Sequence, residues 1–327
     1  MARQRHSGRL RPIGTLLEEV PDKPDAAPRP ARRCPAAVIT HDNVKIGLSY
    51  NTGIYGANPG QMAALAKHAE DCGLESFYLS EHIVLYPGAR AGAVEFPPSL
   101  AVADPLECLS FVAARTERIL LGTGVLLLPY HHPVVLAKRL ATIDVLSQGR
   151  MRLLTVGLGV LPGEAQAIDV EFATRGRRAD EAIDVLRLLW AGDQAGVSFD
   201  GEFFTFEDIC SFPKPCNVQT LPIHVGGSSK AAAVRAGRRG DGYFPGGRLT
   251  AEQRAGQIEI MRTAAVAAGR DPSALEYTRW GPIDVSEAEV NAYAAKGITR
   301  LVVGPSTADP NEQRDQVSAL AERLKLG

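Results

Sequence analysis

The sequence predicts a single (β/α)8 TIM barrel, an α/β fold, on three observations. Short apolar segments alternate with longer amphipathic segments eight times from Lys45 onward. The short segments are apolar on both faces, which is typical of parallel strands covered by helices. The chain has 327 residues, which accommodates a barrel of about 250 residues. We therefore expect residues 44–327 to form one barrel domain.

The predicted strands are apolar runs bounded by turn residues. The first run has the sequence KIGLSY at residues 45–50, and the second has SFYLS at residues 76–80. The six others are expected at residues 119–127, 151–156, 221–225, 241–244, 275–280 and 298–303.

Helix start signals lie between these strands. Asn58 and Pro59 supply an N-cap and a first-turn proline, and Gly73 ends the helix that they open. Asp104 and Glu107 have the form of a capping box, which predicts a helix running to about residue 116. Further helices are expected after Pro133 and at residues 177–191, 229–239, 250–268, 286–296 and 312–325, with Ser286 and Glu289 forming a second capping box.

One interval between predicted strands is much longer than the others. About 65 residues separate the fourth and fifth predicted strands, and they contain a helix and a hairpin that turns at Asp200 and Gly201. A barrel tolerates a long insertion between strands 4 and 5 at the face where the strands end.

The strongest alternative fold is a dinucleotide-binding Rossmann fold, because the fourth strand runs into the sequence VGLGVLPGE. The fingerprint of that fold requires glycine at its sixth position, where this chain has Pro162. The segment also follows the fourth strand instead of the first. We reject this alternative.

Composition excludes several classes of partner. The formal net charge is −1, so the chain has no general attraction to nucleic acid or membrane surfaces. No run approaches the roughly 18 apolar residues of a membrane span. The five cysteines are scattered, which favours a reducing, cytoplasmic location over a disulfide framework.

Residues 1–43 differ in composition from the rest of the chain. They combine arginine and proline with few large apolar side chains, and they contain no continuous apolar stretch of a secretory signal. We expect this segment to be a disordered N-terminal extension.

In a (β/α)8 barrel, the loops after the strands build the functional site. The fifth predicted strand ends in Gly226 and Gly227, followed by Ser228 and a helix start. Two residues without Cβ let backbone amides approach an anion, and the helix N-terminus adds partial positive charge. This pattern predicts a phosphate site, although glycines in such loops also serve tight turns.

The second predicted strand ends in Glu81 and His82, at the same face of the barrel. A histidine there is able to donate or accept a proton near neutral pH, although an ordinary surface Glu–His pair is an equal alternative. The sequence lacks converging His, Asp and Glu sets at strand ends, so we expect no metal ion.

Several ordered segments resemble the luciferase-like monooxygenase superfamily, and within it the actinobacterial branch that depends on coenzyme F420. The resemblance covers about residues 44–305. The matching segments are LESFYLSEHIVL, DPLECLSFVAARTERILLGTGVLLLPYHHPVVLAKRLATIDVLSQGRMRLLTVGLG, EFATRGRRADEAIDVLRLLW, FDGEFFTFEDICSFPKP and LPIHVGGSSKAAAVRAGRRGDGYFP.

The resemblance implies a dimeric catalytic barrel that binds a flavin or deazaflavin ring where the strands end. It implies that His82 lies beside the ring and that the Gly124–Val125 bond is a non-prolyl cis peptide that supports it. Gly157 and Gly159 are expected to pass close to the cofactor, whose phosphate the resemblance places at Gly226, Gly227 and Ser228.

The implied reaction is hydride transfer from reduced F420 to an electrophilic small organic substrate. His82 is expected to donate a proton, with Glu81 as the second catalytic candidate. No carboxylate occurs at Leu158 or Gly159, near which some deazaflavin dehydrogenases have a catalytic glutamate.

Three alternatives remain. The first is an FMN-dependent monooxygenase that uses reduced flavin and O2. A separate reductase would supply this enzyme with its reduced cofactor. The second is a non-catalytic flavin-binding barrel, against which His82 and the phosphate segment argue. The third is a phosphate-binding lyase or isomerase, for which no Schiff-base lysine or metal set is found at a strand end.

Overall fold

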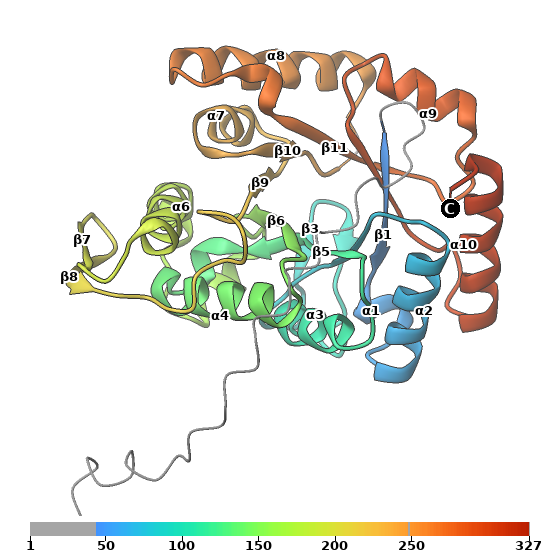
Figure 1. Cartoon of the computed structure of the whole chain (residues 1–327), viewed down its shortest axis with the longest axis horizontal. Coiled ribbons are helices and arrows are strands. Elements are labelled where there is room, and N and C mark those ends of the chain that lie inside the picture. Colours follow the sequence, from blue (N-terminus) through green and yellow to red (C-terminus); the bar gives the residue numbers. More distant parts are fainter. Residues whose placement is uncertain (1–43, 248, 327) are drawn as a thin grey trace, which may run out of the picture. The chain divides into compact units, whose positions relative to one another are not determined.

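A computed structural model of the chain describes residues 44–247 and 249–326, and these residues form a closed barrel of eight parallel strands (Figure 1). The strands follow the order β1-β12-β11-β10-β9-β6-β5-β2 around the barrel. They are β1 (Lys45–Tyr50), β2 (Ser76–Leu79), β5 (Leu120–Leu127), β6 (Met151–Gly157), β9 (Ile223–Gly226), β10 (Gly242–Phe244), β11 (Glu276–Gly281) and β12 (Arg300–Val303). The predicted fold class is confirmed. The extension expected at residues 1–43 lies outside the described residues.

Helices surround the barrel strands in Figure 1. They are α1 (Thr52–Tyr55), α2 (Pro59–Asp71), α3 (Pro105–Ala113), α4 (Pro133–Leu146), α5 (Pro162–Gln166), α6 (Arg175–Ala191), α7 (Lys230–Arg239), α8 (Ala251–Ala267), α9 (Glu287–Ala294) and α10 (Pro310–Leu324). Short 3-10 turns occur at η2 (Leu128–Tyr130), η3 (Phe172–Thr174) and η4 (Pro272–Ala274). Within the described part of the chain, no helix has the length and apolar character that crossing a membrane requires.

The cap of α3 differs from the prediction. Asp104 accepts hydrogen bonds from the amides of Leu106 and Glu107, but Glu107 pairs with Arg139 at 2.6 Å and does not return to the cap. The reciprocal half of the predicted capping box is therefore wrong, and α3 ends at Ala113 instead of about residue 116. The second predicted capping box, on α9, is confirmed in both halves.

The insertion between the fourth and fifth barrel strands holds α5, α6 and a hairpin. Strands β7 (Val197–Asp200) and β8 (Thr205–Ile209) form the predicted antiparallel hairpin, but it turns at residues 201–204, because Asp200 still pairs with Thr205. A second hairpin, which the sequence pattern did not predict, lies in the loop after β2 and consists of β3 (Arg90–Ala91) and β4 (Val94–Glu95).

A buried charged cluster closes the end of the barrel where the strands begin. Arg300 is 1% exposed, donates to Glu75 at 2.6 Å and 3.0 Å, and also pairs with Glu276. Burial opposes ionisation of Glu276, but Arg300 holds the pKa of that carboxyl at about 2. His224 lies 3.5 Å from Glu276, yet burial lowers the pKa of His224 to about 4, so its ring is neutral at pH 7. We call Glu75, Glu276, His224 and Arg300 the barrel-floor cluster.

Large side chains fill the middle of the barrel. Tyr78, Leu153, Phe244 and Val302 pack together in the interior, and Trp280 packs against Phe244 with ring centroids 4.6 Å apart. The interior of the barrel is therefore a packed core and not a pore, and barrels of this kind bind their ligands at the end where the strands finish.

Candidate active site

The predicted site residues all lie at that open end, which we call the mouth. Because the strands of a closed parallel barrel finish at one face, residues far apart in sequence are brought together there. Glu81 and His82 follow β2, Gly124 and Val125 belong to β5, Gly157 ends β6 with Gly159 two residues on, and Gly226 ends β9 before Gly227 and Ser228.

The side chain of Val125 packs against two glycines at the mouth, Gly157 and Gly226. The peptide bond between Gly124 and Val125 is cis, as the resemblance implies. A Cβ added at Gly157 would lie 2.5 Å from Val125 Cγ2, and one added at Gly226 would lie 2.6 Å from Val125 Cγ1. Both positions need glycine because Val125 fills the space beside them. Their contact with a cofactor stays a prediction.

Gly159 lies against Tyr130 of η2. Its φ of +75° favours glycine, and a Cβ there would clash with the Tyr130 hydroxyl. That hydroxyl is buried and has no hydrogen-bond partner among the described residues. Burial, reinforced by the charge of Glu164, raises the pKa of Tyr130 to about 12. The Tyr130 hydroxyl therefore stays protonated near neutral pH and is able to donate a hydrogen bond.

His82 is held by a buried carboxylate that our sequence reasoning missed. Its Nδ1 lies 3.4 Å from Oε2 of Glu164, a residue of α5 that is fully buried. Glu164 Oε1 also accepts a hydrogen bond of 2.6 Å from the amide of Ile83. A carboxylate on Nδ1 fixes the orientation and tautomer of an imidazole and leaves Nε2 for a ligand. The ring also packs on Phe96, with centroids 5.0 Å apart.

Glu81 is bonded within the protein. Its Oε2 accepts a hydrogen bond of 2.6 Å from the amide of Leu127, and its Oε1 lies 3.0 Å from Nε2 of His131. The amide of Glu81 donates to the carbonyl of Val125. These contacts favour a positioning role for Glu81 beside the cis bond, and a direct catalytic role stays a prediction.

A sequence signal for Glu164 existed. Leu158 and Gly159, directly after β6, carry no carboxylate. Pro162 opens α5, and its first turn directs Glu164 back toward the loop that carries His82. A carboxylate in the first turn of a helix that follows a barrel strand is thus equivalent in position to one at the strand end.

The segment after β9 fits an anion. Gly227, Ser228 and Lys230 are exposed, and Gly227 has a φ of +101°. Ser229 caps α7 by accepting a hydrogen bond of 3.1 Å from the amide of Ala232. An exposed, capped N-terminus of this ten-residue helix presents partial positive charge beside the mouth.

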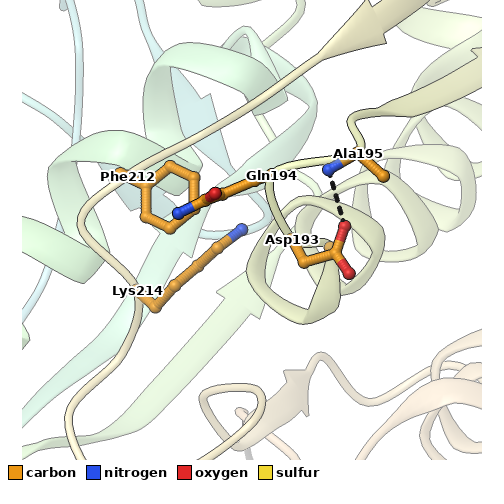
Figure 2. Close-up of a pocket in the computed structure, with 6 residues that line it drawn as sticks. Asp193, Gln194, Ala195, Phe212 and Lys214 are labelled. Atoms are coloured by element: carbon orange, nitrogen blue, oxygen red, sulfur yellow. Dashed lines mark hydrogen bonds between the residues drawn. The ribbon is translucent and has the colours of Figure 1, made fainter.

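Two surface hollows lie outside the mouth. One, of about 430 Å³, is formed where α6 ends, and Figure 2 shows Lys214 beside Phe212 there. Lys214 donates to the carbonyl of Leu189 at 2.7 Å, which satisfies the C-terminus of α6. The other hollow, of about 500 Å³, lies between α6 and α7, where Arg235 and Arg239 are ion-paired with Asp180 and Asp184. Neither contains a predicted catalytic residue.

A closed (β/α)8 barrel that carries a carboxylate-held histidine where its strands end has the architecture of a TIM-barrel enzyme. The sequence model of the luciferase-like monooxygenase family matches residues 40–325, and the chain belongs to that family.

Similar proteins carry two kinds of activity in their names. An F420-dependent glucose-6-phosphate dehydrogenase of Kineococcus radiotolerans is 32% identical over 76% of this chain and 76% of its own length. A limonene 1,2-monooxygenase of Rhodococcus erythropolis is 37% identical over 44% of this chain and 33% of its own length. The structure of an F420-dependent secondary alcohol dehydrogenase with an F420-acetone adduct superimposes with a TM-score of 0.70 at 19% identity, covering 86% of this chain and 98% of the other.

Proposed function

We propose that this protein is an F420-dependent oxidoreductase that transfers a hydride between the deazaflavin and an electrophilic small organic substrate. The observation that carries the proposal is His82, held by Glu164 at the mouth of a luciferase-like barrel. The F420-dependent dehydrogenase among the relatives supports the choice of cofactor.

The residues at the mouth have separate proposed roles in cofactor binding and proton transfer. The Gly124–Val125 segment would support the ring, and Gly227 with Ser228 would hold the phosphate at the start of α7. Bound F420 supplies a hydride to the electrophilic carbon when reduced. His82 donates a proton from Nε2 to the substrate oxygen, so that a carbonyl gains two electrons and two hydrogens and becomes an alcohol. The donor is the ring protonated on both nitrogens, and Glu164 accepts the hydrogen bond from Nδ1 and stabilises that form.

A second candidate is an FMN-dependent monooxygenase, favoured by the limonene monooxygenase among the relatives. The two cofactors share a ring shape and a 5′-phosphate, so the same residues would serve both. Titration of the purified protein with F420 and FMN in parallel, followed by fluorescence, decides between them. Tighter binding of FMN together with O2 consumption would favour the monooxygenase.

We also propose a cytoplasmic homodimer, with a separate reductase if FMN is the cofactor. Val135, Val145 and Leu146 of α4 are exposed apolar side chains, which supports an interface on that helix. Sedimentation velocity of the purified protein reports the oligomeric state.

The phosphate site is tested by Gly227→Val. We expect cofactor affinity to fall 10-fold or more, because a side chain blocks close approach to the backbone amides, at about 1.4 kcal/mol per factor of ten. Gly227 has a φ of +101°, so valine also strains the backbone. Gly269→Val is the matched control, since Gly269 has a φ of +70° and open space around it.

Gly269→Val should lower the free energy of unfolding by a similar amount without lowering cofactor affinity in a fluorescence titration. Unchanged affinity in Gly227→Val would move the phosphate elsewhere, with Gly246 and Gly247 after β10 as the next candidates.

The role of Glu164 is tested by Glu164→Gln. The amide oxygen can still accept from Ile83, but the amide nitrogen cannot accept from Nδ1 of His82. We expect kcat to fall about 10–100-fold, with little change in cofactor affinity. The 15N shifts of the His82 ring should report loss of the Nδ1–H tautomer.

Glu70→Gln is the control, because Glu70 of α2 is also buried and accepts hydrogen bonds from three backbone amides, those of Glu117, Arg118 and Ile119. Glu70→Gln should lower the free energy of unfolding and leave kcat unchanged. Parent-like ring shifts and kcat in Glu164→Gln would show that Glu164 only supports the loop.

A further inference from the structure

Exposed apolar side chains occur on three segments that follow barrel strands at the mouth. They are between 37% and 62% exposed, and they come from α1, from the loop between β2 and α3, and from the loop between β6 and α5. We call them the apolar rim: Ile54, Ile83, Val84, Val94 and Val160. Single exposed apolar residues are common, but Ile83 and Val84 directly follow the candidate catalytic histidine, and apolar surface beside a site often contacts a ligand.

The three segments that carry the rim are tied to one another. The amide of Ala103 donates to Thr52 of α1 at 2.9 Å. The amide of Gly163 donates to the Tyr86 hydroxyl at 3.2 Å, and Glu164 accepts from Ile83. The rim is therefore a preformed surface that adjoins His82.

The same segments carry almost no charge. Apart from His82, residues 82–103 contain only Arg90 and Glu95 as charged side chains, and these two pair with each other at 3.6 Å. Residues 51–58 and 158–163 contain none. Lys230, an exposed cation at the start of α7, belongs to the proposed phosphate segment after β9. β9 is separated from β2 in the barrel by β6 and β5.

We infer that the substrate is a neutral and mainly apolar carbonyl compound, or the corresponding alcohol in the reverse direction. This inference rests on the proposed function. The carbon skeleton lies on the apolar rim, and the carbonyl oxygen meets His82. A phosphorylated or carboxylate substrate would leave its charge without a partner on this side of the mouth, which is costly. The rim thus distinguishes this chain from a sugar-phosphate dehydrogenase.

The first test compares ketones with reduced F420. From 2-butanone through 2-hexanone to 2-octanone, we expect kcat/KM to rise about two- to fourfold per methylene, because each buries apolar area. Dihydroxyacetone phosphate, a ketone of similar size that carries a charge, should be turned over at least 100-fold less efficiently than 2-hexanone. Preference for the phosphorylated ketone would overturn the inference.

The second test changes the rim. Val160→Asp should lower kcat/KM for 2-octanone at least 10-fold and change that for 2-butanone by less than threefold. Val266→Asp is the matched control, because Val266 is similarly exposed on α8 and should have no effect. An equal loss for both ketones in Val160→Asp would contradict contact between the rim and the substrate chain.

Binding without turnover separates this inference from the proposed function. Saturation-transfer NMR of 2-octanone with the cofactor-free protein should show contact that Val160→Asp weakens. If F420 fails to bind but this contact persists, the cofactor assignment fails and the apolar substrate stands. If the ketone does not bind and Val160→Asp converts a dimer to monomer, the rim is a subunit interface and the inference is wrong.

Discussion

Replacing His82 by alanine is expected to lower kcat by roughly 10²–10⁴-fold, the usual range for removing a positioned acid or base. The imidazole lies at the mouth, where Glu164 contacts its Nδ1 and leaves Nε2 for the proposed proton donation. The proposed phosphate segment after β9 belongs to another sector of the barrel. Cofactor affinity should therefore change much less than kcat in a fluorescence titration.

His68→Ala serves as the control for this variant. His68 lies on α2 and contacts the carbonyl of Arg314 and the hydroxyl of Ser318, away from the mouth. It should keep the parent kcat. If His82→Ala keeps nearly the parent kcat, His82 is only a wall of the pocket, and Glu81 or a group on the insertion becomes the candidate.

The barrel could be predicted because its signals are local and repeated. Asn58 with Pro59 opens α2, and the Ser286–Glu289 capping box opens α9, each from a few neighbouring residues. The capping box predicted at Asp104 failed in its second half because Glu107 finds Arg139 on another helix. A local pattern carries no information about such a distant partner.

The site was predictable where position on a strand decides it. Glu81 and His82 lie at the mouth because they follow β2, and the cis bond lies between Gly124 and Val125 as the resemblance implies. The direction of each side chain was not predictable. Glu81 turns inward to the amide of Leu127, while the buried Glu164 turns toward His82 from α5. These choices depend on contacts between loops that no spacing rule encodes.

The glycines show why one residue type supports two interpretations. Gly157 and Gly226 both follow a pattern typical of close approach to a ligand, yet each accommodates the side chain of Val125. Gly227 has an exposed backbone and a positive φ, so it retains the interpretation as a ligand-contacting residue. A phosphate contact at Gly227 and Ser228 stays a prediction.

The barrel-floor cluster explains how a packed barrel carries buried charges at the end opposite the site. Burial alone would lower the pKa of Arg300, but its hydrogen bonds to Glu75 and the charge of Glu276 raise it, so Arg300 stays ionised. Lys45, 3.6 Å from Glu75 and 3.0 Å from Glu276, adds a partly exposed second cation. The cost of desolvating these groups is offset only while every carboxylate keeps its partner.

Arg300→Met is therefore expected to lower the free energy of unfolding by about 3–5 kcal/mol, because it leaves Glu75 and Glu276 without their buried cation. Chemical unfolding followed by circular dichroism measures the change. Adding Glu75→Gln and Glu276→Gln to Arg300→Met should restore part of the loss, since neutral amides no longer need a cation. Arg177→Met is the control, because the Arg177–Glu202 pair is exposed, and its unfolding midpoint should match that of the parent. A midpoint for Arg300→Met equal to that of the control would show that Lys45 alone balances the two carboxylates.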